Sequence, residues 1–279
     1  MKKKARRLCS ITTLLPLFIS FFQASILAKS EGLSSAFSSA RADIEESKGQ
    51  ANLDRKLFDA ADKDDALLIH SLIRRGARVD VRDHGQNTPL LIAAASGAAR
   101  ALRELLIDKA DPNSHNINRD SALTLAANAD HGRADIIRLL LRAHANPNWQ
   151  DGTRDTALIV ASVWDYKDVV TPLLKAHAAL DLQNDKGNTA LMSACGNGQE
   201  DIVRELIQAG ANVNLHSRDG RTALMDAAWI GSPAIAAALI KAGAAVNLRD
   251  NKGETALSIA KAENEQSVAE VLVRAGEKL

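Results

Sequence analysis

Histidine, cysteine and carboxylate side chains carry most enzyme chemistry, but in this chain their spacing fits no catalytic or metal-binding arrangement. The sequence has no Gly-rich phosphate loop, no Gly-x-Ser-x-Gly nucleophile elbow and no His or Cys spacing typical of a metal site. The seven histidines are scattered, and the one regular pair, His144 and His177, lies 33 residues apart because of an internal repeat. We therefore expect no catalytic residue, no cofactor and no metal ion.

Tryptophan points to binding rather than catalysis. Only 3% of the residues are aromatic, yet the chain holds three tryptophans. Trp and Arg most often anchor protein interfaces, because they bury a large area at a low entropic cost. Trp164 and Trp229 are candidates for such anchors, and the alternative is that they cover neighbouring helices. Trp149 comes just before a polar loop, and we expect it to pack beneath that loop.

An internal repeat defines the elements that position these residues. A Thr or Ser anchor, followed by Pro or Ala and then Leu, recurs with spacings of 33, 35, 33, 33 and 33 residues. An Asp or Asn stands eight residues before each anchor, and two ladders in register argue against a chance origin. The anchors are Thr88, Ser121, Thr156, Thr189, Thr222 and Thr255, and the second ladder is Asp80, Asn113, Asn148, Asp181, Asn214 and Asn247.

Each repeat predicts two short helices and a polar turn. The anchor hydroxyl can cap a first, Ala-rich helix such as 191–195 by accepting a backbone N–H bond. A turn at Gly198 precedes a second, amphipathic helix that includes residues 202–207. Gly210 can adopt the left-handed conformation that ends this helix, and residues 214–221 have turn chemistry. Cys195 occupies the second position of the Ala-Ala pair, so we expect a buried small side chain, with a reactive thiol as the alternative.

These residues resemble the ankyrin-repeat pattern. The resemblance lies in Thr-Pro-Leu-x-x-Ala-Ala at 88–94, Gly-Ala-Asn-Val-Asn at 210–214 and Asp-Gly-Arg-Thr-Ala-Leu at 219–224. It implies an all-α solenoid with β-hairpin-like loops and about seven repeats. His144 and His177 stand where the family has its helix-ending Gly, which favours a structural role for both. The family's His after Thr-Pro-Leu is replaced by Leu91, Thr124, Ile159, Met192, Met225 and Ser258.

The array is expected to cover residues 53–279. Its first unit lacks the Thr anchor and its last unit is rich in charge, as terminal repeats need a polar outer face. Residues 127–132 hold the two-residue insertion, which lengthens one turn between helices. The expected units are 53–80, 81–113, 114–148, 149–181, 182–214, 215–247 and 248–279.

The first 28 residues read as a cleavable secretory signal. A basic start, with Lys2 to Lys4, Arg6 and Arg7, precedes an apolar segment over residues 8–22, and small residues near Ala28 suit a cleavage site. The alternative is a retained membrane anchor, which Pro16 and a length under ~20 apolar residues disfavour. Residues 29–52 are rich in Ser, Ala and charge, so we expect a flexible or loosely helical leader.

Cleavage would change the chain's charge and thiol content. The whole chain carries 35 basic and 34 acidic residues, a net charge of +1. Loss of five basic residues leaves 30 − 34 = −4, which gives no electrostatic case for nucleic acid or an anionic membrane. Cys9 would leave with the signal, so Cys195 alone remains and no internal disulfide can form. We expect a monomer without membrane insertion after cleavage.

The resemblance also implies a binding surface. Ankyrin-like arrays bind proteins along a concave face made of loop tips and the exposed ends of the first helices. The residues of this chain at those positions, which we expect to bind protein, are Trp164, Asp185, Lys186, Asn197, His216, Arg218, Asp219, Arg221, Trp229, Ile230, Arg249 and Lys252. A wider set adds Gln150, Asp155, Val163, Gln183, Asn188, Asn251 and Glu254.

These features predict an exported, non-enzymatic protein-binding scaffold. We expect a bacterial periplasmic protein that binds another envelope protein, as an inhibitor, an immunity partner or a protector of an exported enzyme. Three alternatives stay open: a secreted effector that binds a host protein, a structural role in an envelope assembly, and an enzyme with an unrecognised site.

Overall fold

The computed structural model describes residues 48–129 and 133–276. The predicted signal peptide and residues 29–47 of the predicted leader lie outside this part, as do residues 130–132 of the predicted insertion. The chain divides into two units, Met1–Leu53 and Asp54–Leu279. Within the described ranges, no helix combines the length and apolar character needed to cross a membrane.

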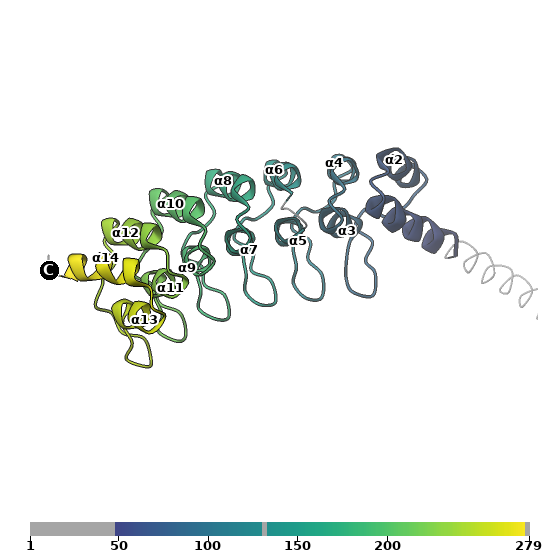
Figure 1. Cartoon of the computed structure of the whole chain (residues 1–279). Helices are drawn as coiled ribbons and strands as arrows, with labels where there is room; N and C mark the ends of the chain where they lie inside the picture. Colours follow the sequence, from purple (N-terminus) through teal and green to yellow (C-terminus); the bar gives the residue numbers. More distant parts are fainter. Residues whose placement is uncertain (1–47, 130–132, 277–279) are drawn as a thin grey trace, which may run out of the picture. The chain divides into compact units, whose positions relative to one another are not determined.

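The second unit is a stack of helix pairs (Figure 1). Residues 48–62 are helical, which includes the end of the predicted leader. The described residues contain isolated β-bridges at His115 and Ser121 and at His216 and Thr222, but no strand. The helices that follow are α2 (Ala66–Arg74), α3 (Pro89–Ala95), α4 (Ala99–Ile107), α5 (Ala122–Asn128), α6 (Ala134–Arg142), α7 (Ala157–Val163), α8 (Lys167–Lys175), α9 (Ala190–Gly196), α10 (Glu200–Gln208), α11 (Ala223–Ile230), α12 (Pro233–Lys241), α13 (Ala256–Ala262) and α14 (Gln266–Gly276).

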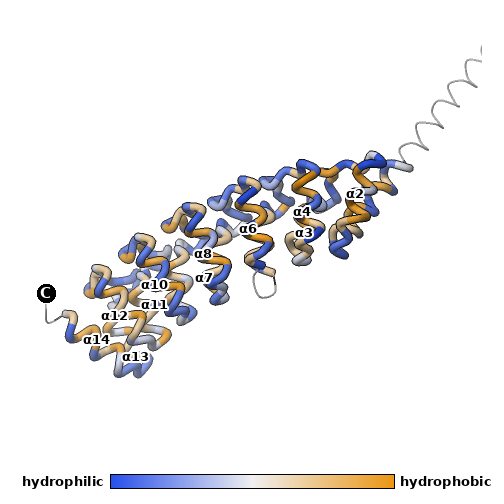
Figure 2. The backbone as a smooth tube through the Cα atoms, turned by 90° about the horizontal axis from the view of Figure 1, so that it is seen from above, coloured by the Kyte–Doolittle hydropathy of each residue, from blue (hydrophilic) through white to orange (hydrophobic). Residues whose placement is uncertain are grey.

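The helices form two rows that share one apolar interior. The first helices of the repeats, α3 to α13 in odd numbers, pack on one another, and the second helices form the other row (Figure 1). Hydrophobic and hydrophilic residues alternate along the helices (Figure 2), as an amphipathic pattern requires. The Ala-Ala pairs are fully buried, for example Ala93 and Ala94, so the first helices approach closely. This arrangement confirms the predicted all-helical solenoid.

The anchors cap the first helices as predicted. The Thr88 hydroxyl accepts the Leu91 N–H at 3.3 Å, and the other five anchors make the same bond three residues ahead. At three anchors, Ser121, Thr222 and Thr255, the residue that replaces the family's His closes a capping box. The Ser121 N–H donates to Thr124 Oγ1, and the Thr255 N–H donates to Ser258 Oγ, both at 2.8 Å.

The second ladder joins each repeat to the next. Asn148 Oδ1 accepts the Ala179 N–H at 2.7 Å, and Asn214 Oδ1 accepts the Ala245 N–H at 2.8 Å. Asp80, Asn113 and Asp181 make equivalent bonds. Each bond satisfies a backbone donor that the next repeat's helices leave free. The ladder seen in the sequence is therefore a row of hydrogen bonds between repeats.

His144 and His177 have the structural role that their repeat position favours. Both follow the end of a second helix with positive φ, 64° and 57°. Gly76, Gly210 and Gly243 occupy the same position in other repeats, with φ between 92° and 97°. The regular spacing of these histidines thus reflects helix termination.

The inter-repeat bonds predict a clear stability difference between two asparagines. Asn148→Ala removes the acceptor of the Ala179 N–H. We expect the free energy of unfolding in urea to fall by about 1–2 kcal/mol, because a backbone donor loses its partner.

Asn247→Ala is the matched control, since Asn247 is exposed, ends unit 215–247 as Asn148 ends unit 114–148, and has no such bond among the described residues. It should change stability by under about 0.5 kcal/mol. Equal losses in the two variants would contradict the assigned role of the ladder.

Candidate protein-binding face

A groove with a volume of about 790 Å³ lies between the loops and the first helices α7, α9 and α11. Trp164 and Trp229 line it, two repeats apart, and the repeat between them contributes Gly196 and Asn197. Gly196 stands where the preceding repeat has Val163 and the next repeat has Trp229, so the smallest residue lies between two larger ones. The hollow follows from this alternation of side-chain size along the row of first helices.

The two indoles are exposed although they are large and apolar. Trp164 follows the end of α7 and is 58% exposed, while Trp229 lies in the last turn of α11 and is 52% exposed. The sequence predicted both at the surface, and the structure confirms this. About half of each residue is open to solvent, and the rest is covered by the protein.

Trp149 has a different role, because its side chain packs against the loop that contains His115 and Arg119. Its Nε1–H donates to the Arg119 backbone oxygen at 2.6 Å, and its ring stacks on His115 with centroids 4.7 Å apart. The Arg119 guanidinium lies 5.4 Å from the ring centroid. Trp149 therefore packs, as predicted, but its partner is the loop of the preceding repeat.

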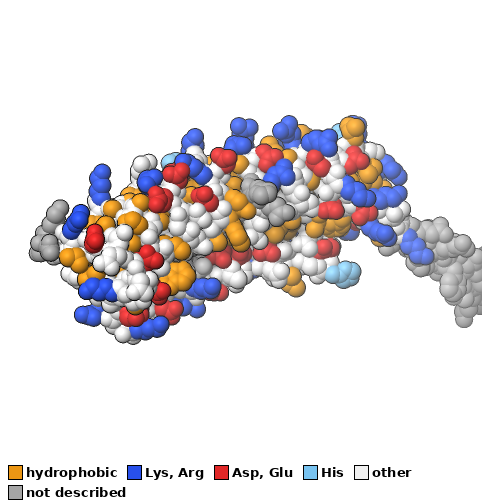
Figure 3. Space-filling view, viewed as in Figure 1, with side chains coloured by type: hydrophobic (Ala, Val, Ile, Leu, Met, Phe, Trp, Pro, Cys, Tyr) orange, Lys and Arg blue, Asp and Glu red, His pale blue; other side chains and the backbone are white. Residues whose placement is uncertain are grey.

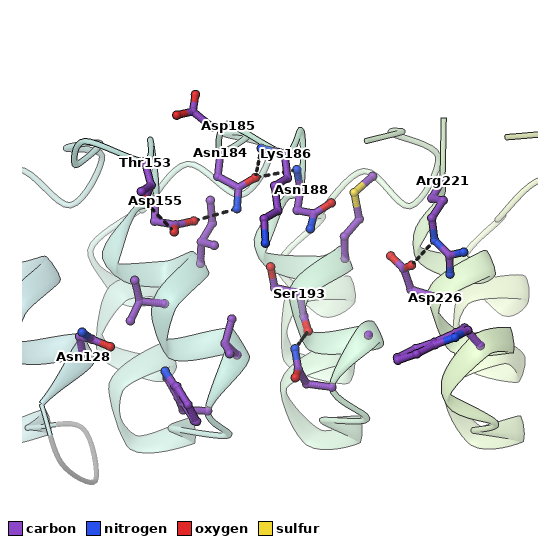
Figure 4. Close-up of a pocket in the computed structure, with 18 residues that line it drawn as sticks. Asn128, Thr153, Asp155, Asn184, Asp185, Lys186, Asn188, Ser193, Arg221 and Asp226 are labelled. Carbon is purple, nitrogen blue, oxygen red and sulfur yellow. Dashed lines mark hydrogen bonds and ion pairs between the residues drawn. The ribbon is translucent and has the colours of Figure 1, made fainter. Parts of the chain in front are cut away.

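Hydrogen bonds fix the polar side chains at the loop edge of the groove (Figure 4). Asp155 accepts the Asn184 Nδ2–H at 2.9 Å and the Thr153 hydroxyl at 3.0 Å. Asn184 Oδ1 accepts the N–H groups of Lys186 and Asn188, which shapes the next loop. These groups are already oriented, so a ligand has little side-chain entropy to remove.

Neighbouring loops are also tied to one another. The Asp185 N–H donates to the Thr153 oxygen, and the Arg218 N–H donates to the Lys186 oxygen, both at 2.9 Å. Gly187 sits at this contact with φ of 78°, and a Cβ there would lie 2.5 Å from the Arg218 nitrogen. Only glycine fits that approach. The loop edge of the groove is thus held as a continuous row.

A partly buried ion pair borders the groove (Figure 4). Arg221 Nε donates to Asp226 Oδ1 at 2.9 Å, and the side chains are 27% and 17% exposed. Burial raises the pKa of Asp226 to about 6, although Arg221 opposes the shift. Cys195 is fully buried nearby, and burial, together with the Asp226 charge, raises its thiol pKa. This confirms the predicted buried side chain and gives no reactive thiolate.

The structure separates the predicted binding residues into groups. Trp164, Asp185, Lys186, Asn197, Arg221 and Trp229 line the groove, together with Asp155, Val163 and Asn188 of the wider set. Arg218 and Asp219 line a smaller hollow beside it. The remaining four, Ile230, His216, Arg249 and Lys252, line neither.

Local contacts explain two of these exclusions. Arg249 Nη1 donates to the Gly253 oxygen of its own loop at 2.7 Å. His216 contributes its backbone oxygen, which accepts the Gln183 Nε2–H at 2.8 Å. Both residues hold loops in shape and lie outside this groove.

Sequence reasoning missed part of the groove floor. Val160, Ser193 and Asp226 line it, each four residues after its anchor, and Ile159 and Met192 come three after theirs. The anchor ladder could have located these positions. The rule applied to the sequence included only the ends of the first helices.

The stacking of α2 on α4 creates a cluster that the sequence spacing did not indicate. Ligand atoms of His70, Glu104 and Asp108 lie within 4.8 Å of one another. His70 Nδ1 already pairs with Glu104 Oε1 at 2.8 Å, and half of the His70 side chain is exposed. Asp108 Oδ2 is buried with no hydrogen-bond partner among the described residues. A divalent cation could bind here by displacing the existing hydrogen bond.

Comparisons with known proteins agree with this geometry. A sequence model of ankyrin repeats (three copies) matches residues 57–151, 90–183, 129–216, 158–250 and 209–279. The human ASB11 ankyrin repeat domain matches with a TM-score of 0.68 and 24% identity, over 78% of this chain and 96% of that one. The ankyrin repeat domain of Bcl-3, a member of the IkappaB protein family, matches with a TM-score of 0.69 and 26% identity, over 78% and 97%. No curated protein matches the sequence.

The raised pKa of Asp226 predicts a pH dependence of stability. Between about pH 4 and pH 6, folded Asp226 keeps a proton that the unfolded chain releases, so stability falls as the pH rises. Asp226→Asn removes this titration. We expect the unfolding free energy of the wild type, relative to the variant, to drop by at most about 3 kcal/mol from pH 4 to pH 7.

Asp64, Asp83 and Asp135 serve as internal references. Burial raises the pKa values of Asp64 and Asp83, but several hydrogen bonds together, including those from Arg100 and Asn87, lower them below the usual value. The hydrogen bond from Arg133 lowers the pKa of Asp135 against burial. These three groups therefore cost stability only as the pH falls below about 4. Denaturant titrations at several pH values measure both effects. Parallel pH profiles of wild type and Asp226→Asn between pH 4 and 7 would contradict the assignment.

Proposed function

Because the chain belongs to the ankyrin-repeat family, we propose that it is a non-enzymatic scaffold that binds another protein in the groove between Trp164 and Trp229. The fold is a protein–protein interaction scaffold. The two half-exposed indoles are the observation that carries the choice of surface. Exposed aromatic anchors beside a preformed hollow are typical of interface centres.

The shape of the groove favours an extended or loop segment of a protein. It is lined by four successive repeats, from Asn128 to Trp229, and is open along the row of first helices. An apolar side chain of the partner fits the hollow above Gly196, with an indole on either side. Lys186, Asp185 and Arg221 border the hollow and can pair with charges of either sign, which gives specificity more than affinity.

We place this scaffold in the bacterial cell envelope, because the basic and apolar N-terminal residues resemble a secretory signal. In the periplasm the partner is an envelope or secreted protein. A groove that covers a loop of an exported enzyme could inhibit that enzyme, act as its immunity partner or protect it. A secreted effector that binds a host protein is the alternative. It uses the same groove and differs in where the mature chain accumulates.

The tryptophans predict a strong loss of binding. We expect Trp164→Ala with Trp229→Ala to weaken capture of the partner by about a hundredfold, as removal of interface anchors typically does. The full chain, tagged at its C-terminus, is expressed in its native cells and captured from the periplasmic fraction. Mass spectrometry identifies the partner, and calorimetry with purified proteins measures affinity.

Two further variants separate binding from folding. Gly196→Phe should also block binding, because a Cβ there lies 3.9 Å from its nearest neighbour, the Asp226 Cβ, and the ring fills the hollow. Leu67→Ala with Ile107→Ala removes two other exposed apolar side chains, 86% and 61% exposed, and should leave binding unchanged. Circular dichroism checks each fold.

The outcomes discriminate among the proposals. A partner that is lost with the Trp variant and kept with the Leu67 and Ile107 variant supports the groove. Equal capture by all variants removes the groove assignment. Recovery of the mature chain mainly from the medium favours the secreted alternative, and N-terminal sequencing tests cleavage after Ala28.

A further inference from the structure

Polar pairs join neighbouring second helices at a regular offset. His70 Nδ1 on α2 pairs with Glu104 Oε1 on α4 at 2.8 Å. The Thr171 hydroxyl on α8 pairs with Glu205 Oε2 on α10 at 3.1 Å. In both pairs the residues are 34 positions apart. A carboxylate at this position of a second helix therefore accepts from the helix before it.

Between α6 and α8 the same offset reaches a proline. Counting 34 residues from Arg138 leads to Pro172, which stands inside α8. A proline ring is shorter than a Glu side chain and cannot accept a hydrogen bond. A hollow of about 450 Å³ lies here, and both Arg138 and Pro172 line it. The interface thus lacks the carboxylate that Glu104 provides between α2 and α4 and that Glu205 provides between α8 and α10.

The hollow is surrounded mainly by positive charge. Arg138, Arg142 and Lys175 line it against a single carboxylate, Asp168. All three cations are exposed, and they form no ion pair with any residue that the structure describes. Figure 3 shows Lys and Arg side chains along the edge of the second helices.

We propose that the hollow between α6 and α8 binds a carboxylate side chain from an acidic segment of a partner protein, which takes the place that Glu104 and Glu205 occupy in other repeats. Arg138 donates to this carboxylate, and Arg142 and Lys175 attract the acidic residues beside it. A carboxylate is favoured over a phosphate because two equivalent interfaces of this chain, α2 with α4 and α8 with α10, hold a Glu side chain at this position.

This second surface is independent of the Trp groove. The groove is lined by loops and first helices, whereas the hollow is lined by α6 and α8 of the second row. One partner segment can occupy the groove while an acidic segment of the same or another protein binds the hollow. The two surfaces can therefore be tested separately.

The test uses the full chain as it is isolated from cells, with an acetylated tetraglutamate peptide as the probe. Nuclear magnetic resonance titration should show amide shifts centred on α6 and α8. Pro172→Glu should weaken binding about tenfold or more, because the new carboxylate fills the hollow and pairs with Arg138. Arg138→Gln should weaken it about fivefold.

Two matched variants should keep the affinity of the wild type. Pro172→Ala removes the proline without adding a carboxylate, and Arg103→Gln neutralises the exposed arginine at the equivalent position of α4. Arg103 is exposed and Pro172 is half-buried. Circular dichroism therefore checks the fold of each variant.

Several results would overturn the proposal. These are shifts outside α6 and α8, equal binding to Pro172→Glu, equal binding of a tetraglutamine peptide, or tighter binding of inorganic phosphate than of tetraglutamate. Trp164→Ala with Trp229→Ala should bind the peptide as the wild type does. Loss of peptide binding in that variant would place the site in the groove instead.

Discussion

The fold depends on one constraint, which is that no repeat can bury its apolar residues alone. Each repeat is a pair of short helices, and stacking on the next pair covers the Ala-rich first helix and the apolar side of the second. Buried anchors such as Thr88 and Thr189 cap the helices inside this stack. Asn and Asp side chains then join successive repeats through backbone N–H groups, so capping and stacking reinforce each other.

The candidate groove is a local variation on this regular frame. Because the backbone repeats, a change of side-chain size at one repeat position directly changes the surface. Gly196 lies between two repeats with large residues near the same position, Trp164 and Trp229, and this contrast produces the hollow. The hydrogen bonds of Asp155 and Asn184 keep its loop edge in shape without a ligand. The frame supplies rigidity, and a few substituted positions supply the binding surface.

Charged side chains are more buried beside the groove than on the row of second helices. Beside the groove, Arg221 pairs with Asp226, and burial disfavours the negative charge of the Asp226 carboxylate. Cys195 is buried nearby. On the second row most charged side chains are exposed, and an ion pair between exposed side chains adds little stability by itself. The charge at a given repeat position can therefore differ among repeats with little cost in stability. Pro172, which stands where α4 and α10 have a Glu, is such a difference.

The sequence by itself determined the repeat, the helix caps, the helix-ending role of His144 and His177, and the burial of Cys195. These features depend on local backbone geometry and on periodicity, which a 33-residue pattern expresses directly. Only the tertiary structure decided that His70 meets Glu104 and which predicted residues lie outside the groove. Those contacts join side chains about one repeat apart, and whether they meet depends on how each repeat is rotated and packed on the next.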